Sequence, residues 1–398
     1  MKLTELVRNC PICGNGTGEL LHSQSFILPA DSPLPAHYNI VCCVNCGFVF
    51  ADTPANQDIY NEYYTRLSKY EDLSISSGGG ADQFDNDRLA GSTQVIQKFI
   101  ASHSSSLLDI GCANGGLLQD LRKQDYHNIF GIDPSPTCIS HVRSKGITCF
   151  EGDLFSLSFK NMTRQFDCIV LTHVLEHIHD LQAAVDNISD RLKEDGILFI
   201  EVPDASNYSE HYIVPYYYID CEHINHFDTH SLGNLFCSKG FIQLESRNIN
   251  FMVNGTNRYP AVYSVFQKSG KGQPARSKYS ATAKESFLHF LKQSADHNEN
   301  EKIIQDLMTT QEPVFVWGAG QFALRLLANS GLGNCNIQGF IDGDANKQGR
   351  SIADYTIFDP EHIRGRSTSV VVCSALHTED IVGRIRSLSE RSNVYLMK

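Results

Sequence analysis

The chain has no long apolar run and no excess of positive charge. No stretch approaches the roughly 20 apolar residues that a membrane-spanning helix needs, and the first residues, Met1 to Glu5, lack the apolar core of a signal peptide. Acidic residues outnumber basic ones by 45 to 33, for a formal net charge of −12, so no broad basic surface can bind a phosphate backbone. We therefore expect a cytoplasmic monomer or weak homo-oligomer that binds neither membranes nor nucleic acid.

The length and composition are typical of a globular protein with several domains. At about 150 residues per domain, a chain of 398 residues predicts two or three domains, and 41% hydrophobic with 20% charged residues is an ordinary globular balance. The thirteen cysteines are spread through predicted strands and one cluster of pairs. That distribution indicates a reducing compartment and a metal site, not a disulfide framework.

Residues 107–116, LLDIGCANGG, predict a buried strand that ends in a glycine-rich turn, with a helix over residues 117–123. Gly111, Ala113 and Gly115 let the backbone approach a ligand closely, and the free N–H groups at the helix start favour a polar or anionic group. The next predicted strand ends at Asp133, 22 residues after Gly111, where a carboxylate can accept from both hydroxyls of a ribose. A tight turn of an ordinary doubly wound sheet gives a similar pattern.

The glycine pattern alone does not separate a nicotinamide cofactor from S-adenosylmethionine, but three later segments do. Residues 149–154 place Asp153 where an adenine amino group could donate to it, residues 166–171 form a fourth strand that leads into T-H-V-L-E-H, and residues 192–202 form a fifth. With D-x-G-x-x-x-G, the ribose acid, G-D and V-L-E-H in order over residues 107–202, the chain resembles the class I S-adenosylmethionine-dependent methyltransferases.

That resemblance implies a set of cofactor contacts, although each residue could also be an ordinary turn or capping residue. Gly111, Ala113 and Gly115 would face the methionine end, Asp133 with Pro134 next to it would take the ribose, Asp153 and Leu154 the adenine, and Thr172 would lie below the sulfonium.

Two C-x2-C pairs near the start of the chain predict a metal site. Cys10 and Cys13 are separated from Cys43 and Cys46 by 29 residues, and each pair is followed by a glycine turn. Four thiolates would form a closed tetrahedral Zn²⁺ site with a structural role. Cys42 is an alternative ligand, but its four-residue step to Cys46 favours Cys43; unpaired thiols in a loop are the other interpretation.

The segments on either side of the cofactor strand suggest the domain order. Residues 58–70 hold four tyrosines in eleven residues, which could cover a ligand or form a half-buried helix between domains. Residues 76–81 read as a flexible hinge, and residues 83–101 as a helix. We expect a zinc-binding lobe with the tyrosine-rich segment over 1–75, a methyltransferase core over 76–268, a linker over 269–282 and a C-terminal domain over 283–398.

The later part of the chain predicts further elements of both domains. Residues 228–232 should begin a helix capped by Asp228 or Thr229, residues 251–255 and 261–266 should pair as antiparallel strands, and residues 283–308 should be helical. Beyond them a second α/β unit repeats the cofactor pattern, because Asp342 follows Gly318 by 24 residues. The expected fold is therefore α/β: a class I methyltransferase Rossmann-like core flanked by an N-terminal zinc-binding lobe and a C-terminal Rossmann-like domain that helps to hold substrate.

The whole arrangement, with W-G-A-G and D-x-x-x-x-K-Q-G in the last domain, resembles the C-methyltransferases that act on nucleotide-linked 4-keto-deoxysugars. The resemblance implies that His223 is the base, that Glu222 binds a sugar hydroxyl or stabilises the imidazolium, and that Tyr63 or Tyr64 joins the sugar site. A carbon next to a ketone needs such a base, because it is a poor nucleophile until its proton is removed, and an imidazole with a pKa near ~6.5 can remove it at neutral pH. The chain departs from the family after K-Q-G, where G-R-S-I-A-D-Y-T-I replaces a proline- and glycine-rich segment.

Other functions are compatible with parts of the sequence. An O-methyltransferase of a sugar or other small molecule is the main alternative, followed by a zinc-lobed RNA methyltransferase and a non-catalytic scaffold. His223, His226 and His230 could hold a second metal, although all three lie in one short loop. His173 and His177, spaced four apart, could also be ligands but more simply cap and pack a helix after the fourth strand.

Overall fold

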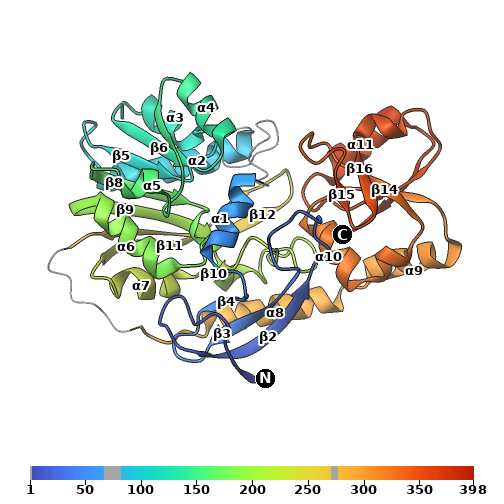
Figure 1. Cartoon of the computed structure of the whole chain (residues 1–398), viewed down its shortest axis with the longest axis horizontal. Coiled ribbons are helices and arrows are strands. Elements are labelled where there is room, and N and C mark those ends of the chain that lie inside the picture. Colours follow the sequence, from blue (N-terminus) through green and yellow to red (C-terminus); the bar gives the residue numbers. More distant parts are fainter. Residues whose placement is uncertain (1, 67–81, 270–276) are drawn as a thin grey trace.

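The computed structural model describes residues 2–66, 82–269 and 277–398, which form three β-sheets with helices packed around them (Figure 1). The predicted α/β class is confirmed. The predicted hinge over residues 76–81, the last four residues of the tyrosine-rich segment and residues 270–276 of the predicted linker lie outside the described residues.

The first sheet is antiparallel and carries the cysteine pairs in its turns. Its order is β1-β2-β3-β4-β10, with bounds β1 Leu3–Glu5, β2 Thr17–Ser25, β3 His37–Cys43, β4 Val49–Asp52 and β10 Asn225–His226. The last strand comes from the middle of the chain, where Asn225 pairs with Phe50. Helix α1, Gln57–Arg66, follows this sheet and contains most of the predicted tyrosine-rich segment.

The second sheet has seven strands in the order β11-β12-β9-β8-β5-β6-β7. The bounds are β5 Leu107–Ile110, β6 Ile129–Asp133, β7 Thr148–Glu151, β8 Phe166–Thr172, β9 Leu192–Pro203, β11 Ile242–Met252 and β12 Arg258–Gln267. Strands β5 to β9 are mutually parallel, and β12 pairs antiparallel with both β9 and β11. The predicted antiparallel pair is present, but its first strand is Ile242–Met252, and residues 253–255 of the strand predicted over 251–255 lie in the connection to β12. The carboxyl ends of β5, β6, β7 and β8 therefore meet at one edge of the sheet, where ligands bind in folds of this kind.

Helices cover both faces of the second sheet, and successive residues of β5 face opposite ways. Leu107 packs with helices α2 (Gln83–Phe99), α3 (Gly116–Lys123) and α4 (Pro136–Ser144). Leu108 packs on the other face with α6 (Leu181–Arg191) and α7 (Thr229–Cys237), in the same buried cluster as Cys10, Cys43 and Cys46. Asp228 caps α7, because its carboxylate accepts from the Ser231 amide at 2.7 Å. A short helix α5, Leu157–Lys160, follows β7.

The third sheet has the order β15-β16-β14-β13-β17-β18 and is parallel apart from β15. Its strands are β13 Val314–Trp317, β14 Ile337–Ile341, β15 Ser351–Ile352, β16 Tyr355–Phe358, β17 Ser369–Val372 and β18 Asn393–Leu396, and its helices include α10 Gln321–Asn329 and α11 Thr378–Leu388. The segment that departs from the family pattern forms the β15-β16 hairpin.

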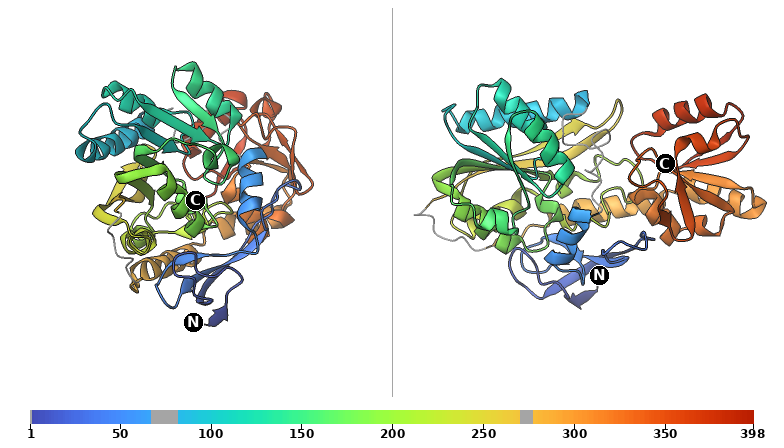
Figure 2. Two further views of the ribbon diagram at one scale, coloured as in Figure 1. Left: turned by 60° about the vertical axis from the view of Figure 1, so that its left-hand side comes forward. Right: turned by 45° about the horizontal axis from the view of Figure 1, so that its top comes forward.

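The helix predicted over residues 283–308 is two helices, α8 Thr282–Asp296 and α9 Glu299–Thr310. The break falls at His297, which has an extended backbone, in a run of Asp, His and Asn that has low helix propensity. Figures 1 and 2 show α8 leading to the third sheet, which lies at one end of the molecule with α9, α10 and α11. A single cluster of buried residues connects the first sheet, α8 and the third sheet, because it includes Ile40 of β3, Phe287 of α8 and Val316 of β13.

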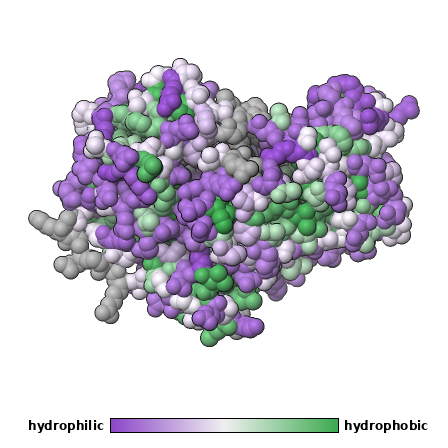
Figure 3. Space-filling model, viewed as in Figure 1, coloured by the Kyte–Doolittle hydropathy of each residue, from purple (hydrophilic) through white to green (hydrophobic). Residues whose placement is uncertain are grey.

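The face of the molecule seen in Figure 3 is mostly hydrophilic, with apolar residues in small groups. Among the helices of the described residues, none combines the length and the apolar character needed to span a bilayer.

Gly131, in the middle of β6, offers a test of the packing beneath the cofactor edge. A Cβ at this position would lie 2.6 Å from the Cys112 sulfur and 2.8 Å from the Cys149 sulfur, so we expect Gly131→Ala to lower the free energy of unfolding by about 1–3 kcal/mol. Gly91→Ala is the control, because Gly91 is exposed in α2 with nothing near its added Cβ; it should raise stability by about 0.5–1 kcal/mol. Urea unfolding measures both, and equal stabilities would contradict the packing.

Candidate functional site

The turn after β5 has a backbone that only small residues allow. Gly111, Ala113 and Gly115 have φ angles of +73°, +43° and +74°. An added Cβ would lie 2.6 Å from the Val174 side chain at Gly111 and 2.9 Å from the Val142 side chain at Gly115. The two glycines are therefore needed both for the backbone angle and for the space.

Asp133, at the end of β6, holds this turn in place. One of its carboxylate oxygens accepts from the Ala113 amide at 2.9 Å, and the other accepts from the Ser135 amide at 2.9 Å. The carboxylate therefore connects the turn after β5 to the start of α4. Pro134, directly after it, is half-buried.

The other residues predicted to bind the cofactor lie at the ends of β7 and β8. The carbonyl of Asp133 accepts from the Gly152 amide at 2.9 Å, which brings the following residues to the same edge. The Asp153 carboxylate accepts from the Phe155 amide at 2.7 Å, and burial raises its pKa. Leu154 is buried, and Thr172 is the last residue of β8.

Asp109, in β5 just before this turn, is a buried acid that is not among the predicted cofactor contacts. It is 3% exposed, and its Oδ1 atom has no hydrogen-bond partner among the described residues. Burial, with a smaller contribution from the charge of Asp133, raises its pKa to about 8. With its carboxyl protonated at neutral pH, Asp109 carries no charge, and the Asp133 carboxylate is the anion beside the turn. That carboxylate and the small-residue turn fit S-adenosylmethionine, whose sulfonium and ammonium are positive.

A cluster of imidazoles, carboxylates and tyrosines lies next to the cofactor turn. The side chain of Val174 lies against Gly111, and a short 3-10 helix, Leu175–His177, follows directly after Val174. The ring of His177 lies 4.7 Å from the ring of His223, centroid to centroid. His223 is the more accessible of the two, because it is half-buried whereas His177 is buried.

Both predicted tyrosines contact this cluster: Tyr63 contacts Glu222, and Tyr64 contacts His177. The Tyr63 hydroxyl donates to the Glu222 carboxylate at 2.9 Å, and the Tyr64 hydroxyl lies 2.7 Å from Nδ1 of His177. Burial and the charge of Glu222 raise the pKa of Tyr63 well above its usual value, so its hydroxyl keeps its proton and donates. The sequence did not decide which of the two tyrosines joins the site, and the structure brings both of them to the same cluster.

His223 and Glu222 are held through the backbone of their own loop. The Asp220 carboxylate accepts from the amides of Glu222 and His223 at 2.8 and 2.7 Å, and its other oxygen lies 3.7 Å from Nδ1 of His223. The Glu222 carbonyl lies 3.2 Å from Nδ1 of His177. These contacts direct Nδ1 of both rings toward oxygen atoms, and in His223 they leave Nε2 as the nitrogen available for proton transfer.

The site residues expected from the sequence did not include Glu176, and His177 was expected to cap and pack a helix. No helix runs from His173 to His177 in the structure, and His177 belongs to the imidazole cluster. Glu176 is fully buried, and one of its oxygens accepts from Nδ1 of His173 at 3.2 Å. Against the effect of burial, that contact lowers the pKa of Glu176. Ligand atoms of Glu176, His177 and His223 lie within 4.8 Å of one another. The adjacent acid and histidine of V-L-E-H were the available signal.

The other two loop histidines considered as metal ligands point elsewhere. His226 is completely buried, with Nδ1 3.3 Å from the Tyr208 hydroxyl. His230 is 59% exposed, with Nδ1 3.9 Å from the Asp228 carboxylate.

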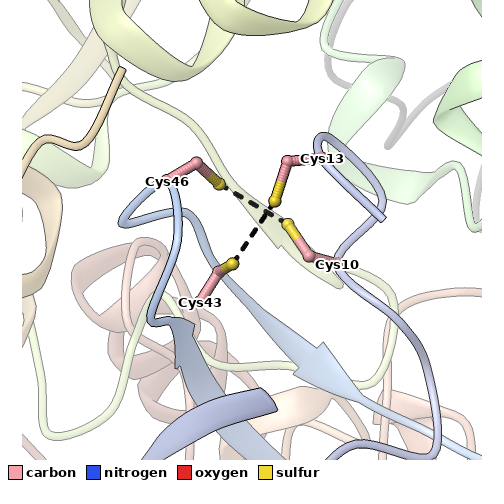
Figure 4. A group of neighbouring side chains, drawn as sticks. All are labelled: Cys10, Cys13, Cys43 and Cys46. Atoms are coloured by element: carbon pink, nitrogen blue, oxygen red, sulfur yellow. Dashed lines mark hydrogen bonds between the residues drawn. The ribbon is translucent and has the colours of Figure 1, made fainter. Parts of the chain in front are cut away.

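The four cysteine sulfurs predicted to bind metal come together (Figure 4). The Sγ–Sγ distances are 3.6 Å between Cys10 and Cys46 and 3.5 Å between Cys13 and Cys43. A tetrahedron with Zn–S bonds of ~2.3 Å has edges of about 3.8 Å, so the sulfur positions fit a tetrahedral ion of that size. The thiol of Cys42 is outside this group. It lies 3.4 Å from the Gly47 carbonyl, and burial raises its pKa to about 12.

Comparisons with known proteins agree with this geometry at the level of the domain. Residues 83–245 match the family described as "Methyltransferase domain", and residues 310–394 match the family described as "C2185-like, N-terminal". Over 110 residues the chain is 30% identical to a ubiquinone biosynthesis O-methyltransferase of Xylella fastidiosa, covering 26% of this chain and 44% of the relative. The chain thus spans less than half the length of this curated relative.

Two of the similar solved structures are also methyltransferases. An S-adenosylmethionine-dependent methyltransferase from Clostridium acetobutylicum has 16% identity and a TM-score of 0.37, over 47% of this chain and 94% of the other. An N-methyltransferase from Bradyrhizobium japonicum has 19% identity and a TM-score of 0.36, over 47% of this chain and 99% of the other. The family match confirms the predicted methyltransferase domain over residues 83–245.

Asp109 should make stability depend on pH. The folded chain keeps its carboxyl protonated up to about pH 8, whereas in the unfolded chain it ionises near ~3.9. Between these values the folded state holds the extra proton, so this group's contribution to stability falls as pH rises, by at most about 1.4 kcal/mol per pH unit. Asp109→Asn removes that dependence. Relative to the natural chain, the variant should gain stability from pH 5 to pH 8.

Urea unfolding of both proteins across this pH range is the measurement. Asp125→Asn is the control, because Asp125 is exposed at the end of α3. A constant stability difference between Asp109→Asn and the natural chain at every pH would contradict the raised pKa.

Proposed function

We propose that the chain is an S-adenosylmethionine-dependent C-methyltransferase that methylates a carbon next to the ketone of a nucleotide-linked keto-deoxysugar, through an enolate. The observation that carries the proposal is the acid–base cluster of His177, His223 and Glu222 beside the cofactor turn. His177 lies only three residues beyond Val174, which contacts Gly111.

This cluster suits methylation at carbon because the proton on such a carbon must be removed before the methyl group is transferred. An imidazole with a free Nε2 atom can remove it, and a partly exposed ring is accessible to a substrate. His223 meets both conditions, so we assign it as the base. His177, whose Nδ1 is turned toward the Glu222 carbonyl and the Tyr64 hydroxyl, lies beside it.

The acids and tyrosines around His223 would keep the substrate and the new positive charge in place. Asp220 faces Nδ1 of His223, and the buried carboxylate of Glu176 lies close to both imidazoles, so either can stabilise an imidazolium. Glu222 and Tyr63, hydrogen-bonded to each other, would bind sugar hydroxyls. When bound, S-adenosylmethionine would supply the methyl group as a sulfonium electrophile.

The C-terminal domain supports a nucleotide-linked substrate, because the first turn of this domain has the same amide-to-carboxylate hydrogen bond as the cofactor turn. The Ala319 amide donates to the Asp342 carboxylate at 2.8 Å, as the Ala113 amide donates to Asp133. Asp342 also lies 3.3 Å from the Lys347 ammonium. We assign this turn to the nucleotide portion of the substrate.

Methylation at oxygen is the second candidate, favoured by the name of the Xylella fastidiosa relative. An oxygen nucleophile also benefits from a nearby base, so the cluster is compatible with it. The two reactions differ in one observable, the exchange of a carbon-bound proton with solvent.

His223→Asn tests the base. We expect turnover to fall by about 10²- to 10⁴-fold, the usual range for loss of a general base, while S-adenosylmethionine still binds in a calorimetric titration. His230→Asn is the control, because His230 is exposed on α7, and it should keep normal activity. Near-normal activity of His223→Asn would reject the assignment.

Hydrogen exchange distinguishes the two reactions without mutagenesis. In D2O with S-adenosylhomocysteine, the natural enzyme should wash deuterium into the carbon next to the ketone of a thymidine diphosphate-linked 4-keto-6-deoxyhexose. His223→Asn should slow this exchange as much as it slows turnover. Methylation of that sugar without any exchange would favour transfer to oxygen.

We also propose that the Cys10, Cys13, Cys43 and Cys46 group binds one structural Zn²⁺. All four positions of a tetrahedral ion would be occupied by sulfur, which leaves none for water. The ion would connect the two turns of the first sheet. The first of these turns also contacts the methyltransferase domain, where the Gln182 amide donates to the carbonyls of Pro11 and Ile12 at 3.0 Å.

Substitution of neighbouring cysteines tests this site. The purified natural chain should contain one zinc ion by elemental mass spectrometry, Cys43→Ala should lose it, and Cys42→Ala should retain it. Because the ion stabilises the folded lobe, Cys43→Ala should also melt at a lower temperature. Retention of full zinc by Cys43→Ala, or its loss from Cys42→Ala, would contradict the ligand set.

A further inference from the structure

Helix α10 of the C-terminal domain reaches the loop that carries Glu222 and His223. Gln321, its first residue, lies with its amide nitrogen 2.9 Å from the Cys221 sulfur and 3.5 Å from the Glu222 carboxylate. The carbonyl oxygen of the same side chain accepts from the Cys221 amide at 3.4 Å. One side chain thus contacts the backbone, the thiol and the neighbouring carboxylate of the loop.

Arg325, one helical turn further along α10, holds the same loop at a second place. Its guanidinium donates to the Ile219 carbonyl at 2.8 Å and to the Pro215 carbonyl at 3.2 Å. The side chain is almost completely buried, and burial lowers its pKa to about 10. Because a buried charge is costly to leave without partners, these contacts fix the position of α10 against the loop and place Gln321 at Glu222.

The Glu222 carboxylate receives donors from two different lobes. Its Oε1 atom accepts from Tyr63 of α1 at 2.9 Å and faces the Gln321 amide at 3.5 Å. Loss of the Gln321 amide would leave Tyr63 alone of these two donors, so the carboxylate would be held less firmly in its orientation. The orientation of Glu222, next to the base, therefore depends on a residue of the C-terminal domain.

We propose that Gln321 is a positioning residue for methyl transfer, which orients Glu222 and so makes the C-terminal domain a part of the active site. The proposal rests on the proposed function for the role of Glu222, but the contacts that carry it are those of the loop and α10. Gln321 does not need to touch the sugar. It acts through Glu222, and the chemistry remains with His223.

The first test is the kinetics of Gln321→Ala with S-adenosylmethionine and the thymidine diphosphate-linked 4-keto-6-deoxyhexose. We expect kcat to fall by about 10- to 100-fold, the range found when supporting partners of functional groups are removed. KM and the affinity for S-adenosylhomocysteine should change little. Gln338→Ala is the matched control in the same domain, because Gln338 is exposed on β14, and it should leave kcat unchanged.

The second test adds a charge and does not depend on the sugar. Gln321→Glu would put a carboxylate beside Glu222, near the titratable groups around that residue: Tyr63 of α1, His177 after β8, and Asp220, Cys221 and His223 of its own loop. The added carboxylate should shift the imidazole resonances of His223 in an NMR spectrum of the full zinc-loaded chain. Gln338→Glu, with the same added charge on an exposed site, should not.

The outcomes separate this proposal from the proposed function. If the natural enzyme neither methylates the sugar nor exchanges its proton, the proposed function fails for this substrate class, and the NMR spectrum alone decides the role of Gln321. Unshifted His223 resonances in Gln321→Glu, or a normal kcat in Gln321→Ala, overturn the positioning role. A fall in activity matched by a lower melting temperature and lost S-adenosylhomocysteine affinity overturns it as well, because that pattern is general unfolding.

Discussion

The segment over residues 215–224 is hydrogen-bonded to all three sheet-containing parts of the molecule, and the candidate site depends on this convergence. The Ile224 carbonyl accepts from the Ala51 amide of the first sheet, and the Ile224 amide donates to the Glu176 carbonyl beside the second. Arg325 holds two further carbonyls from the third. Only while these contacts persist do His223 and Glu222 lie next to the residues that follow β8.

Buried charge is concentrated around this segment and is balanced by nearby groups. His173 lies between two carboxylates, 3.2 Å from Glu176 and 3.4 Å from Glu201, and Glu201 also pairs with Arg88 at 2.8 Å. Burial alone would favour the neutral acids, yet the contacts with His173 and Arg88 lower the pKa of Glu201 to about 2. The edge of the second sheet therefore keeps Glu201 ionised in a largely dehydrated setting, because Arg88 and His173 balance its charge there.

The same hydrogen bond between a turn and the end of the next strand occurs in both α/β units. In both α/β units a glycine-rich turn is held by an amide of the turn bonded to the acid that ends the next strand, Ala113 to Asp133 and Ala319 to Asp342. The first unit matches a methyltransferase domain, and the second matches a different family. Because α10 begins directly after the second turn and its first residue contacts Glu222, the two units meet at the proposed reaction centre rather than through a flexible connection.

Much of this could be read from the sequence, because the relevant patterns are local. The strand ending at Ile110, the turn Gly111 to Gly115 and the acid at Asp133 are close in the chain, and their spacing predicts an α/β unit. The later segments with Asp153 and V-L-E-H, taken with this spacing, predict the methyltransferase domain. The C-x2-C pairs likewise predict a four-sulfur group. Only the tertiary structure brought His177 and Glu176 beside His223, joined residues 225–226 to the first sheet, divided the helix predicted over 283–308, and brought Gln321 to Glu222, 99 residues away. Contacts of that kind depend on how whole sheets pack against each other, and no short-range spacing in the chain records that packing.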